Sequence, residues 1–240
     1  MKLERLISDS RPFLGWLVDW YNSRPALDLG QAVEDVGGAG HFAVMAVDVT
    51  NGFCHSGPLS SKRVGAIVGP IVNLFAHAYE LGVQHFVLPQ DTHSDHAVEF
   101  GSFAPHCVAG TSESETVGEL MALPFAHLFT VIEKNSISVA IGTDLDAWLD
   151  AHPEVTAFLV VGDCTDLCTY QLAMHLRLRA NAANLRDVRV IAPMDGVDTF
   201  DIPLDVAEGL GIMPHPGDLL HLVFLYSMAQ NGIEIVAKVV

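Results

Sequence analysis

The stretch TAFLVVGDCTDLC, residues 156–168, decides the fold class of this 240-residue chain. Its first part, residues 156–163, is mostly apolar and ends on a Gly-Asp pair, which predicts a buried strand. A helix is predicted directly behind it, over residues 166–182. A buried strand that leads into a helix is the repeating unit of an α/β protein with a parallel sheet.

The rest of the chain repeats this alternation of strand and helix. Further strands are expected at residues 42–49, 85–90, 127–134, 187–193 and 233–239. Helices are expected at 61–81, 143–152 and 216–232, the first because its apolar residues recur every three or four positions. Thr143 would cap the second helix, and Gly232 would end the third. The sequence therefore predicts a three-layer α/β/α fold around a mainly parallel sheet of about six strands.

Residues 1–41 fit this pattern less well and are predicted to form a helical N-terminal extension before a main domain at 42–240. Their segments LERLI and FLGWLVDWY suit one or two amphipathic helices, and the glycines of GGAG (37–40) interrupt the chain before the first strand. We expect the extension to pack on the domain or on a neighbouring subunit. The protein is accordingly expected to be a homo-oligomer.

The composition excludes several classes of partner. Twelve Lys and Arg stand against 29 Asp and Glu, a net charge of −17, so neither nucleic acid nor an anionic membrane is an expected partner. No apolar run approaches the ~20 residues that cross a bilayer, and the charged start MKLERLISDS argues against a secretory signal. Four cysteines are too few for a disulfide scaffold. We expect a cytoplasmic protein with free thiols.

Three chemically distinct side chains are expected at one rim of the sheet. Asp48 ends the first predicted strand, Lys134 ends the third, and Cys168 lies in the first turns of the helix behind the fourth. Because parallel strands end at the same edge, these residues should converge. A thiol near a helix N-terminus and a Lys is favoured as a thiolate. The set is the outline of an activated nucleophile with an acid/base partner.

A metal site is predicted in QDTHSDHAVEFGSFAPHCVAGT (90–111), which follows the second strand. Asp91 and His93 are separated by one residue, so both can face the same ion from an extended segment. His106 and one of His96 or Glu99 would complete the set. Such nitrogen and oxygen ligands suit Zn²⁺, Fe²⁺ or Mn²⁺. The other nine of the 12 histidines are assigned no function.

Four segments together resemble the nicotinamidases, which belong to the isochorismatase-like cysteine hydrolases. The segments are DVTNGFC (48–54), DTHSDHAVEFGSFAPHCVAGT (91–111), the strand end at Lys134 and VVGDCTDLC (160–168), in the family's order and at comparable spacing. The resemblance runs from about Phe42 to Asp198 and more loosely beyond, with residues 201–214 interpreted as an insertion. The Asp-x-His pair before APHCVAGT is typical of the metal-containing nicotinamidases.

The resemblance implies a role for each residue of the predicted catalytic group. Cys168 looks like the nucleophile, Asp48 like the carboxylate that handles protons, and Lys134 like the third member. A cis peptide bond is implied between Asp163 and Cys164. That bond would present the amides of Cys164 and Cys168 as an oxyanion hole.

The resemblance also implies the metal ligands and the walls of the substrate pocket. The implied ligands are Asp91, His93 and His106, with Glu99 as the fourth and His96 as its rival. Phe53 and Phe103 match the aromatic positions that sandwich a pyridine ring. Zn²⁺ is the ion expected first, with Fe²⁺ or Mn²⁺ as alternatives.

The expected function is a metal-containing cysteine amidohydrolase that converts nicotinamide to nicotinate and ammonia through a Cys-linked thioester. A related amidohydrolase acting on another small amide or ureide is the nearest alternative, although such enzymes mostly lack the Asp-x-His with a later Pro-His-Cys. A metal- or ligand-binding subunit without activity is disfavoured by the intact Asp48, Lys134 and Cys168. A redox pair of Cys164 and Cys168 is disfavoured because three residues separate them, where thioredoxin-like pairs have two.

Overall fold

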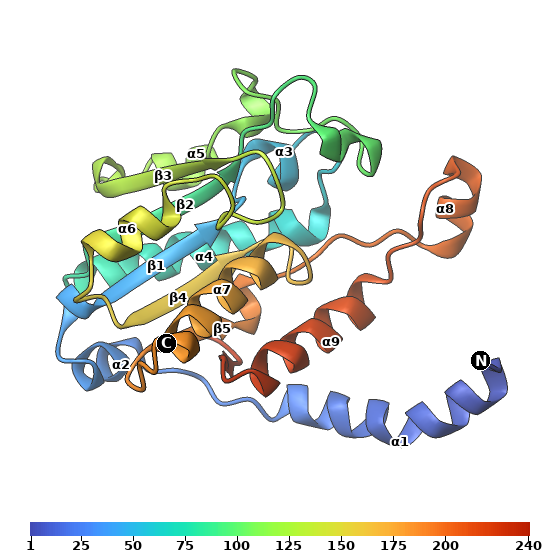
Figure 1. Cartoon of the computed structure of the whole chain (residues 1–240), viewed down its shortest axis with the longest axis horizontal. Coiled ribbons are helices and arrows are strands. Elements are labelled where there is room, and N and C mark those ends of the chain that lie inside the picture. The colour runs from blue at the N-terminus through green and yellow to red at the C-terminus, as the bar shows by residue number, and fades with distance from the viewer.

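In the computed structural model, which describes residues 1–240, six parallel strands form the middle layer (Figure 1). The strands are β1 (Phe42–Val47), β2 (His85–Asp91), β3 (Phe129–Lys134), β4 (Ala157–Gly162), β5 (Arg189–Pro193) and β6 (Glu234–Val236). They lie in the order β3-β2-β1-β4-β5-β6, and every neighbouring pair is parallel. The predicted fold class, with about six strands, is confirmed.

Helices cover both faces of this sheet (Figure 1). They are α1 (Leu3–Asn22), α2 (Leu29–Asp35), α3 (Asn51–Cys54), α4 (Lys62–Glu80), α5 (Gly118–Met121), α6 (Leu145–Ala151), α7 (Cys168–Ala182), α8 (Leu204–Leu210) and α9 (Gly217–Gln230). Buried side chains of α2, α4 and α5 form one core on one face, and those of α6, α7 and α9 form a second core on the other.

The central strand β1 shows why its sequence is apolar at every position. Its residues Phe42, Val44 and Ala46 belong to the core beneath α4. Ala43, Met45 and Val47 belong to the core beneath α7 and α9. A strand covered on both faces has no solvent-exposed side, so alternation is lost and a continuous apolar run remains.

The observed elements depart from the predicted ones mainly at their ends. Helix α6 starts at Leu145 with Asp144 as its N-cap residue, so the predicted cap at Thr143 is wrong, although the Thr143 hydroxyl still accepts a bond from the Leu145 amide at 3.2 Å. Strand β6 is shorter than predicted because the Ala237 amide bonds the carbonyl of Pro25 and the chain leaves the sheet there. The short helices α3, α5 and α8 carry too few turns for a periodic pattern to indicate them.

The N-terminal residues form one long helix, α1, followed by the shorter α2. Leu17 is the only buried residue of α1, whereas α2 packs into the core with Leu29, Ala32 and Val33. The α1 helix lies against α9, and its first turns extend past the body of the molecule (Figure 1). No helix of the structure combines the length and the apolarity needed to cross a membrane.

Candidate active site

The strand order places four buried polar residues in a row at the carboxyl edge of the sheet. Strand β2 ends at Asp91 and β3 at Lys134, and the two residues are paired in register. Asp48 follows β1, and Asp163 follows β4. All four side chains are buried. The sequence predicted that side chains would converge here because parallel strands end at the same edge of the sheet. The structure brings the residues at these strand ends together.

Backbone geometry turns Asp48 towards the neighbouring strand. Its φ of 53° lies in the left-handed region, which Asp tolerates better than most residues. The Asp48 amide donates to the carbonyl of Pro89 at 2.9 Å, and its Oδ1 accepts a bond from the Asp91 amide at 2.7 Å. The carboxylate is therefore fixed at both its backbone and its side chain before any substrate arrives.

The turn after β4 brings Cys168, the predicted nucleophile, to this edge. Gly162 allows the close approach, because a Cβ there would lie 2.0 Å from the carbonyl oxygen of Val47. The peptide bond between Asp163 and Cys164 is cis, as the resemblance implied. The amides of Cys164 and Cys168 donate to no group of the chain, whereas those of Thr165, Leu167 and Thr169 are bonded. Two free donors thus lie beside the thiol of Cys168, which opens α7.

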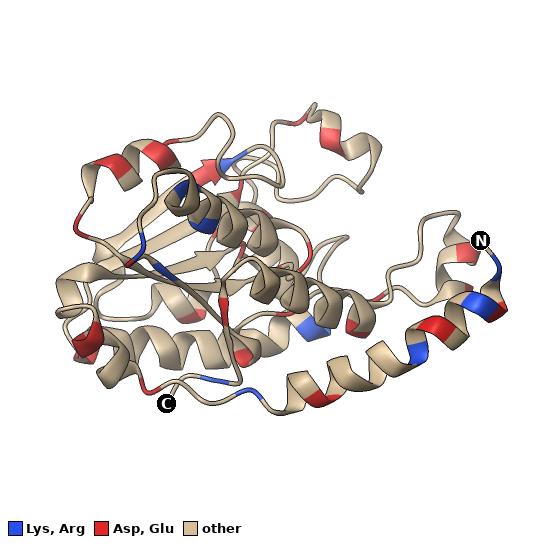
Figure 2. Cartoon of the chain, turned by 60° about the horizontal axis from the view of Figure 1, so that its bottom comes forward, with Lys and Arg blue, Asp and Glu red and all other residues tan.

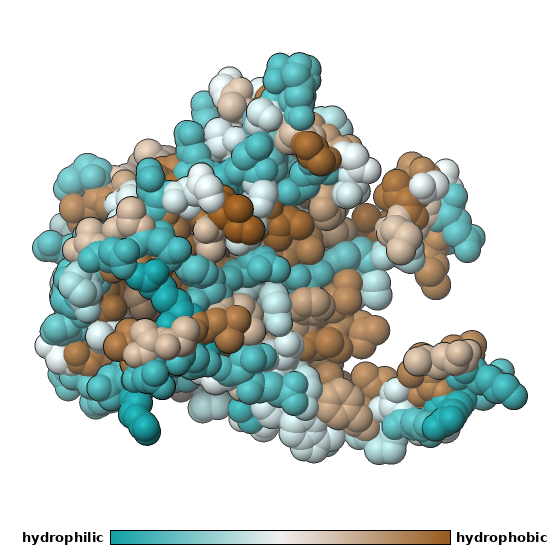
Figure 3. Space-filling view, in the orientation of Figure 1, coloured by the Kyte–Doolittle hydropathy of each residue, from teal (hydrophilic) through white to brown (hydrophobic).

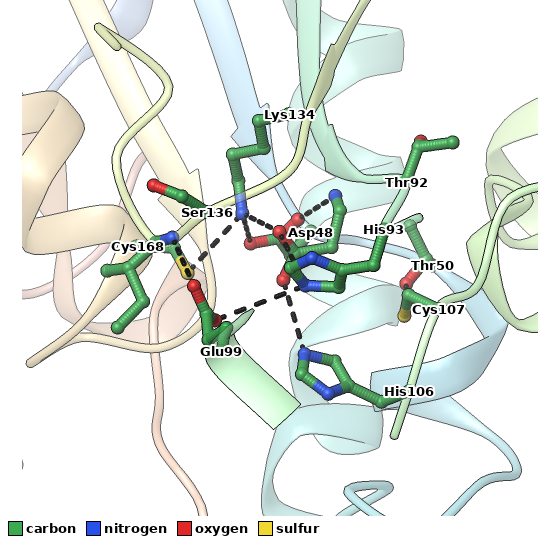
Figure 4. A network of polar contacts seen from close by, with 12 residues as sticks. Asp48, Thr50, Thr92, His93, Glu99, His106, Cys107, Lys134, Ser136 and Cys168 are labelled. Carbon is green, nitrogen blue, oxygen red and sulfur yellow. Dashed lines mark hydrogen bonds and ion pairs between the residues drawn. The ribbon is translucent and has the colours of Figure 1, made fainter. Parts of the chain in front are cut away.

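The Lys134 amine lies at the centre of the predicted catalytic group (Figure 4). Its Nζ donates hydrogen bonds to Asp91 Oδ1 at 2.5 Å and to Cys168 Sγ at 3.5 Å. It also forms an ion pair with Asp48 Oδ2 at 2.8 Å. Burial alone would lower the pKa of Lys134, but the surrounding Asp48, Cys168 and Asp91 hold it well above its usual value. The amine is therefore a permanent cation.

Burial and charge act in opposite directions on the Cys168 thiol. Burial raises the pKa of the thiol well above its usual value; Lys134 acts in the opposite direction, while Asp48 and Asp91 raise it further. Lys134 thus favours the thiolate, as predicted, while burial opposes it. Burial, followed by the charge of Asp91, also raises the pKa of Asp48 to about 6. The Cys168 sulfur and an Asp48 carboxylate oxygen lie within 4.8 Å of each other.

Asp91, His93 and His106 form a second group that could hold a metal ion, their ligand atoms within 4.8 Å of one another. The Nε2 atoms of His93 and His106 lie 3.4 and 3.6 Å from the two Asp91 oxygens (Figure 4). Each ring is oriented through Nδ1, His93 by Asn135 Oδ1 at 3.3 Å and His106 by the Ala104 carbonyl at 2.8 Å.

The chemistry of this group fits a divalent metal. His93 Nε2 is buried without a hydrogen-bond partner, which leaves a lone pair for an ion to use. A carboxylate and two imidazoles, each held by a second contact, are the donor set of a zinc-type site. The residues present therefore suit the metal that the sequence indicated.

The two candidates for the fourth ligand lie in different places. Glu99 Oε1 is 4.0 Å from His93 Nε2, and Glu99 Oε2 accepts a bond from the Ile137 amide at 3.2 Å. The side chain of His96 is 92% exposed, and its one ion pair is with Asp95 at 3.8 Å. Of the two candidates, only Glu99 lies near the metal-ligand group of Asp91, His93 and His106.

A small cavity opens onto both groups. It is lined by Asp48, Phe53, Leu59, Asp91, Glu99, Phe103, His106, Ile137, Asp163, Cys164, Leu167, Cys168 and Phe200. Phe53 and Phe103, the two aromatic residues implied by the resemblance, are both among the lining residues. Phe200 was missed by the sequence analysis, since it falls in a segment with no periodic pattern. A small cavity with apolar walls and several buried polar groups is typical of a site for a small molecule.

Phe200 is tied to the nucleophile turn through His215, to which the sequence analysis assigned no function. The two rings stack with centroids 3.7 Å apart. His215 Nε2 lies 2.9 Å from Asp166 Oδ2, and the Thr199 hydroxyl donates to Asp166 Oδ1 at 2.6 Å. Asp166 lies between Cys164 and Cys168, so one carboxylate links the wall of the cavity to the turn that carries the thiol.

Comparison with known proteins gives a consistent result. The isochorismatase domain family matches residues 42–210. Among curated proteins, Nicotinamidase 1 of Arabidopsis thaliana is 29% identical over 214 residues, which cover 82% of this chain and 85% of that protein.

Solved structures share the fold. Nicotinamidase PncA from Bacillus subtilis is 22% identical, with a TM-score of 0.65, over 82% of this chain and 99% of that one. N-carbamoylsarcosine amidase from Thermoplasma acidophilum is also 22% identical, with a TM-score of 0.60, over 81% of this chain and 95% of that one. At this level of identity the likeness concerns the fold alone.

Proposed function

Because the chain belongs to the isochorismatase domain family, we propose that it is a cysteine amidohydrolase that converts nicotinamide to nicotinate and ammonia. One observation carries the proposal: the buried Lys134 amine joins Asp48 and Cys168 to Asp91, which itself lies beside His93 and His106. A nucleophile and a metal-type ligand set therefore share one edge of the sheet. Identity of 29% to a nicotinamidase over most of the chain supports the same activity.

Binding would be governed by the cavity walls and the metal ligands. Phe53 and Phe103 would take the two faces of a pyridine ring. Asp91, His93 and His106 would hold a divalent metal, Zn²⁺ first and Fe²⁺ or Mn²⁺ as alternatives, which when bound would supply a Lewis-acid anchor for the ring nitrogen. Orientation by these residues would leave the carboxamide carbon facing Cys168.

The first chemical step would form a thioester. The Cys168 thiol would give its proton to the Asp48 carboxylate while the sulfur attacks the amide carbon. The free amides of Cys164 and Cys168 would bind the oxyanion, each donor contributing roughly 3–4 kcal/mol. Asp48 would then return the proton to the leaving nitrogen, and ammonia would depart.

The second step would hydrolyse the thioester. Asp48 would take a proton from water as its oxygen attacks the carbonyl carbon, and the C–S bond would break. The proton would pass back to the sulfur, restoring thiol and carboxylate. Lys134 would stay protonated throughout, and its charge would favour both the ionised Asp48 and the departing sulfur.

An assay of ammonia release over a panel of amides tests the proposal. Nicotinamide is expected to react well, benzamide poorly because it lacks the ring nitrogen, and N-carbamoylsarcosine poorly because it lacks the ring. Cys168→Ala should abolish release, whereas Cys54→Ala, which removes a thiol outside the cavity, should keep it. Equal rates on benzamide and nicotinamide would contradict the role of the metal group, and preference for N-carbamoylsarcosine would favour the ureide alternative.

A further inference from the structure

Two segments of the structure expose apolar side chains on the same side of the molecule. The first half of α1 and the helix α8 both project from the body, with a hollow between them (Figures 1 and 3). Apolar residues that remain exposed there are Leu3, Leu6, Ile7, Leu204, Leu210 and Met213. Ile7 is 57% and Met213 84% exposed. Two exposed apolar segments that face each other across a hollow are typical of an interaction site.

The chain itself does not cover this surface. Helix α1 touches the body through rings of its second half, where Phe13, Trp16 and Trp20 surround Tyr226 at centroid distances of 5.3 to 6.1 Å. Every residue from 1 to 9 is exposed, although the helix already begins at Leu3. Helical turns without tertiary packing are only marginally stable in water, so this half of α1 needs a partner surface.

The two segments differ in the sign of their net charge (Figure 2). Residues 1–16 hold Lys2, Arg5 and Arg11 against Glu4 and Asp9, a net charge of +1. Residues 204–213 hold Asp205 and Glu208 and no Lys or Arg, a net charge of −2. The surface at α1 is therefore slightly basic and apolar, while the surface at α8 is acidic and apolar. The two are complementary to each other, and both are present on every copy of the chain.

We propose that the hollow is the interface between two copies of this chain, each inserting the first half of its α1 beside the α8 of the other. Such an exchange is reciprocal, so a two-fold axis closes it and leaves neither surface exposed. Residues 1–12 and 204–213 would lie at this interface on each copy, close in number to the 20–30 residues per side that stable interfaces use. A second copy of the chain would cover the exposed apolar side chains and would match the charge of both segments. The proposed interface therefore needs no other protein.

Sedimentation velocity over a wide range of protein concentration tests the proposal. The wild-type chain is expected to be a dimer. Leu6→Asp with Ile7→Asp, or Leu210→Asp with Met213→Asp, should weaken dimerisation at least about 100-fold, because each pair removes two buried apolar side chains. Ile141→Asp, at a residue that is 72% exposed elsewhere, is the matched control and should leave the dimer intact.

Charge reversal provides a second test that does not depend on the apolar variants folding. Lys2→Glu with Arg5→Glu, and Asp205→Lys with Glu208→Lys, alter only exposed side chains. Each pair alone should shift the protein towards monomer, and the four changes together should restore the dimer. A monomeric wild-type chain, or a dimer that all of these variants leave intact, overturns the proposal. Binding of a monomeric wild-type chain to phosphatidylserine vesicles also overturns it, since the surface would then be a membrane surface.

Discussion

At the scale of single residues, the buried Lys134 amine explains how two carboxylates remain charged side by side. Asp48 and Asp91 lie on adjacent strands, and without a cation between them their repulsion and desolvation would favour protonation. The coupling is mutual, because the same carboxylates keep Lys134 ionised in a site where burial alone would favour the neutral amine. The charge state of the whole catalytic group thus rests on one side chain.

Replacing Lys134 by Met should therefore affect stability as well as catalysis. The variant keeps most of the length of the side chain but leaves Asp48 and Asp91 buried without a cation. We expect a loss of about 3–5 kcal/mol in the free energy of unfolding, measured by urea denaturation, together with loss of ammonia release. Full stability in the Met variant would show that the ion pairs do not carry this charge balance.

The two histidines of the DTHSDH segment should differ in metal binding. Calorimetric titration of Zn²⁺ into His93→Ala is expected to show a loss of affinity, because a buried ligand atom beside Asp91 is removed. His96→Ala is the matched control from the same segment and should bind as the wild type does, since its side chain is exposed. Equal losses in both variants would contradict the ligand set.

At the scale of elements, the ion pair between His215 and Asp166 holds the segment after β5 to the turn that precedes Cys168. Burial alone would raise the pKa of Asp166, but hydrogen bonds from His215 and Thr199 outweigh it and lower the pKa. Burial alone would lower the pKa of His215, but the bond and charge of Asp166 raise it. The stabilisation from Asp166 is fully present above its unfolded pKa of about 3.9, and that from His215 is fully present below its unfolded pKa of about 6.5.

His215→Gln should accordingly change the pH dependence of stability. The stabilisation that wild type has over the variant is expected to be largest between about pH 4 and 6.5. It should shrink as the pH rises through the folded pKa of His215 and as it falls through that of Asp166. Urea denaturation across this range checks the prediction. A difference that is constant with pH would mean that the two side chains are not an ion pair.

Residues at the ends of regular elements were predictable from the sequence, and residues beside the predicted insertion were not. Asp48, Lys134 and Cys168 could be placed together because apolar runs mark the strands and parallel strands end at one edge. Phe200 and His215 reach the site from a segment between β5 and α9 whose path no periodic pattern describes. The depth at which Cys168 is buried could not be predicted either, since it depends on packing from several elements at once.

At the scale of the whole molecule, the net charge of −17 is unevenly distributed. The body is acidic, and the segment that carries α1 is slightly basic (Figure 2). The amphipathic pattern of the sequence predicted that the N-terminal extension is helical. The direction in which α1 extends is a tertiary property, because it follows from the aromatic contacts with Tyr226 on α9.

High salt should weaken the proposed dimer. Charges of opposite sign at an exposed interface are screened within about 10 Å at 0.1 M salt, so added salt should reduce the attraction between α1 and α8. Sedimentation at rising NaCl concentration is expected to show a higher dissociation constant. The apolar contacts should keep part of the affinity, and a dimer that tightens steadily with salt would contradict the charge argument.

The proposed mechanism requires that Cys168 becomes covalently acylated during turnover. Mass spectrometry of acid-quenched enzyme with nicotinamide tests this step. We expect an increase by the mass of a nicotinoyl group, located on the peptide that contains Cys168 and absent in Cys168→Ala. Ammonia release at an undiminished rate by Cys168→Ala, or an acyl group on a different residue, would contradict the mechanism.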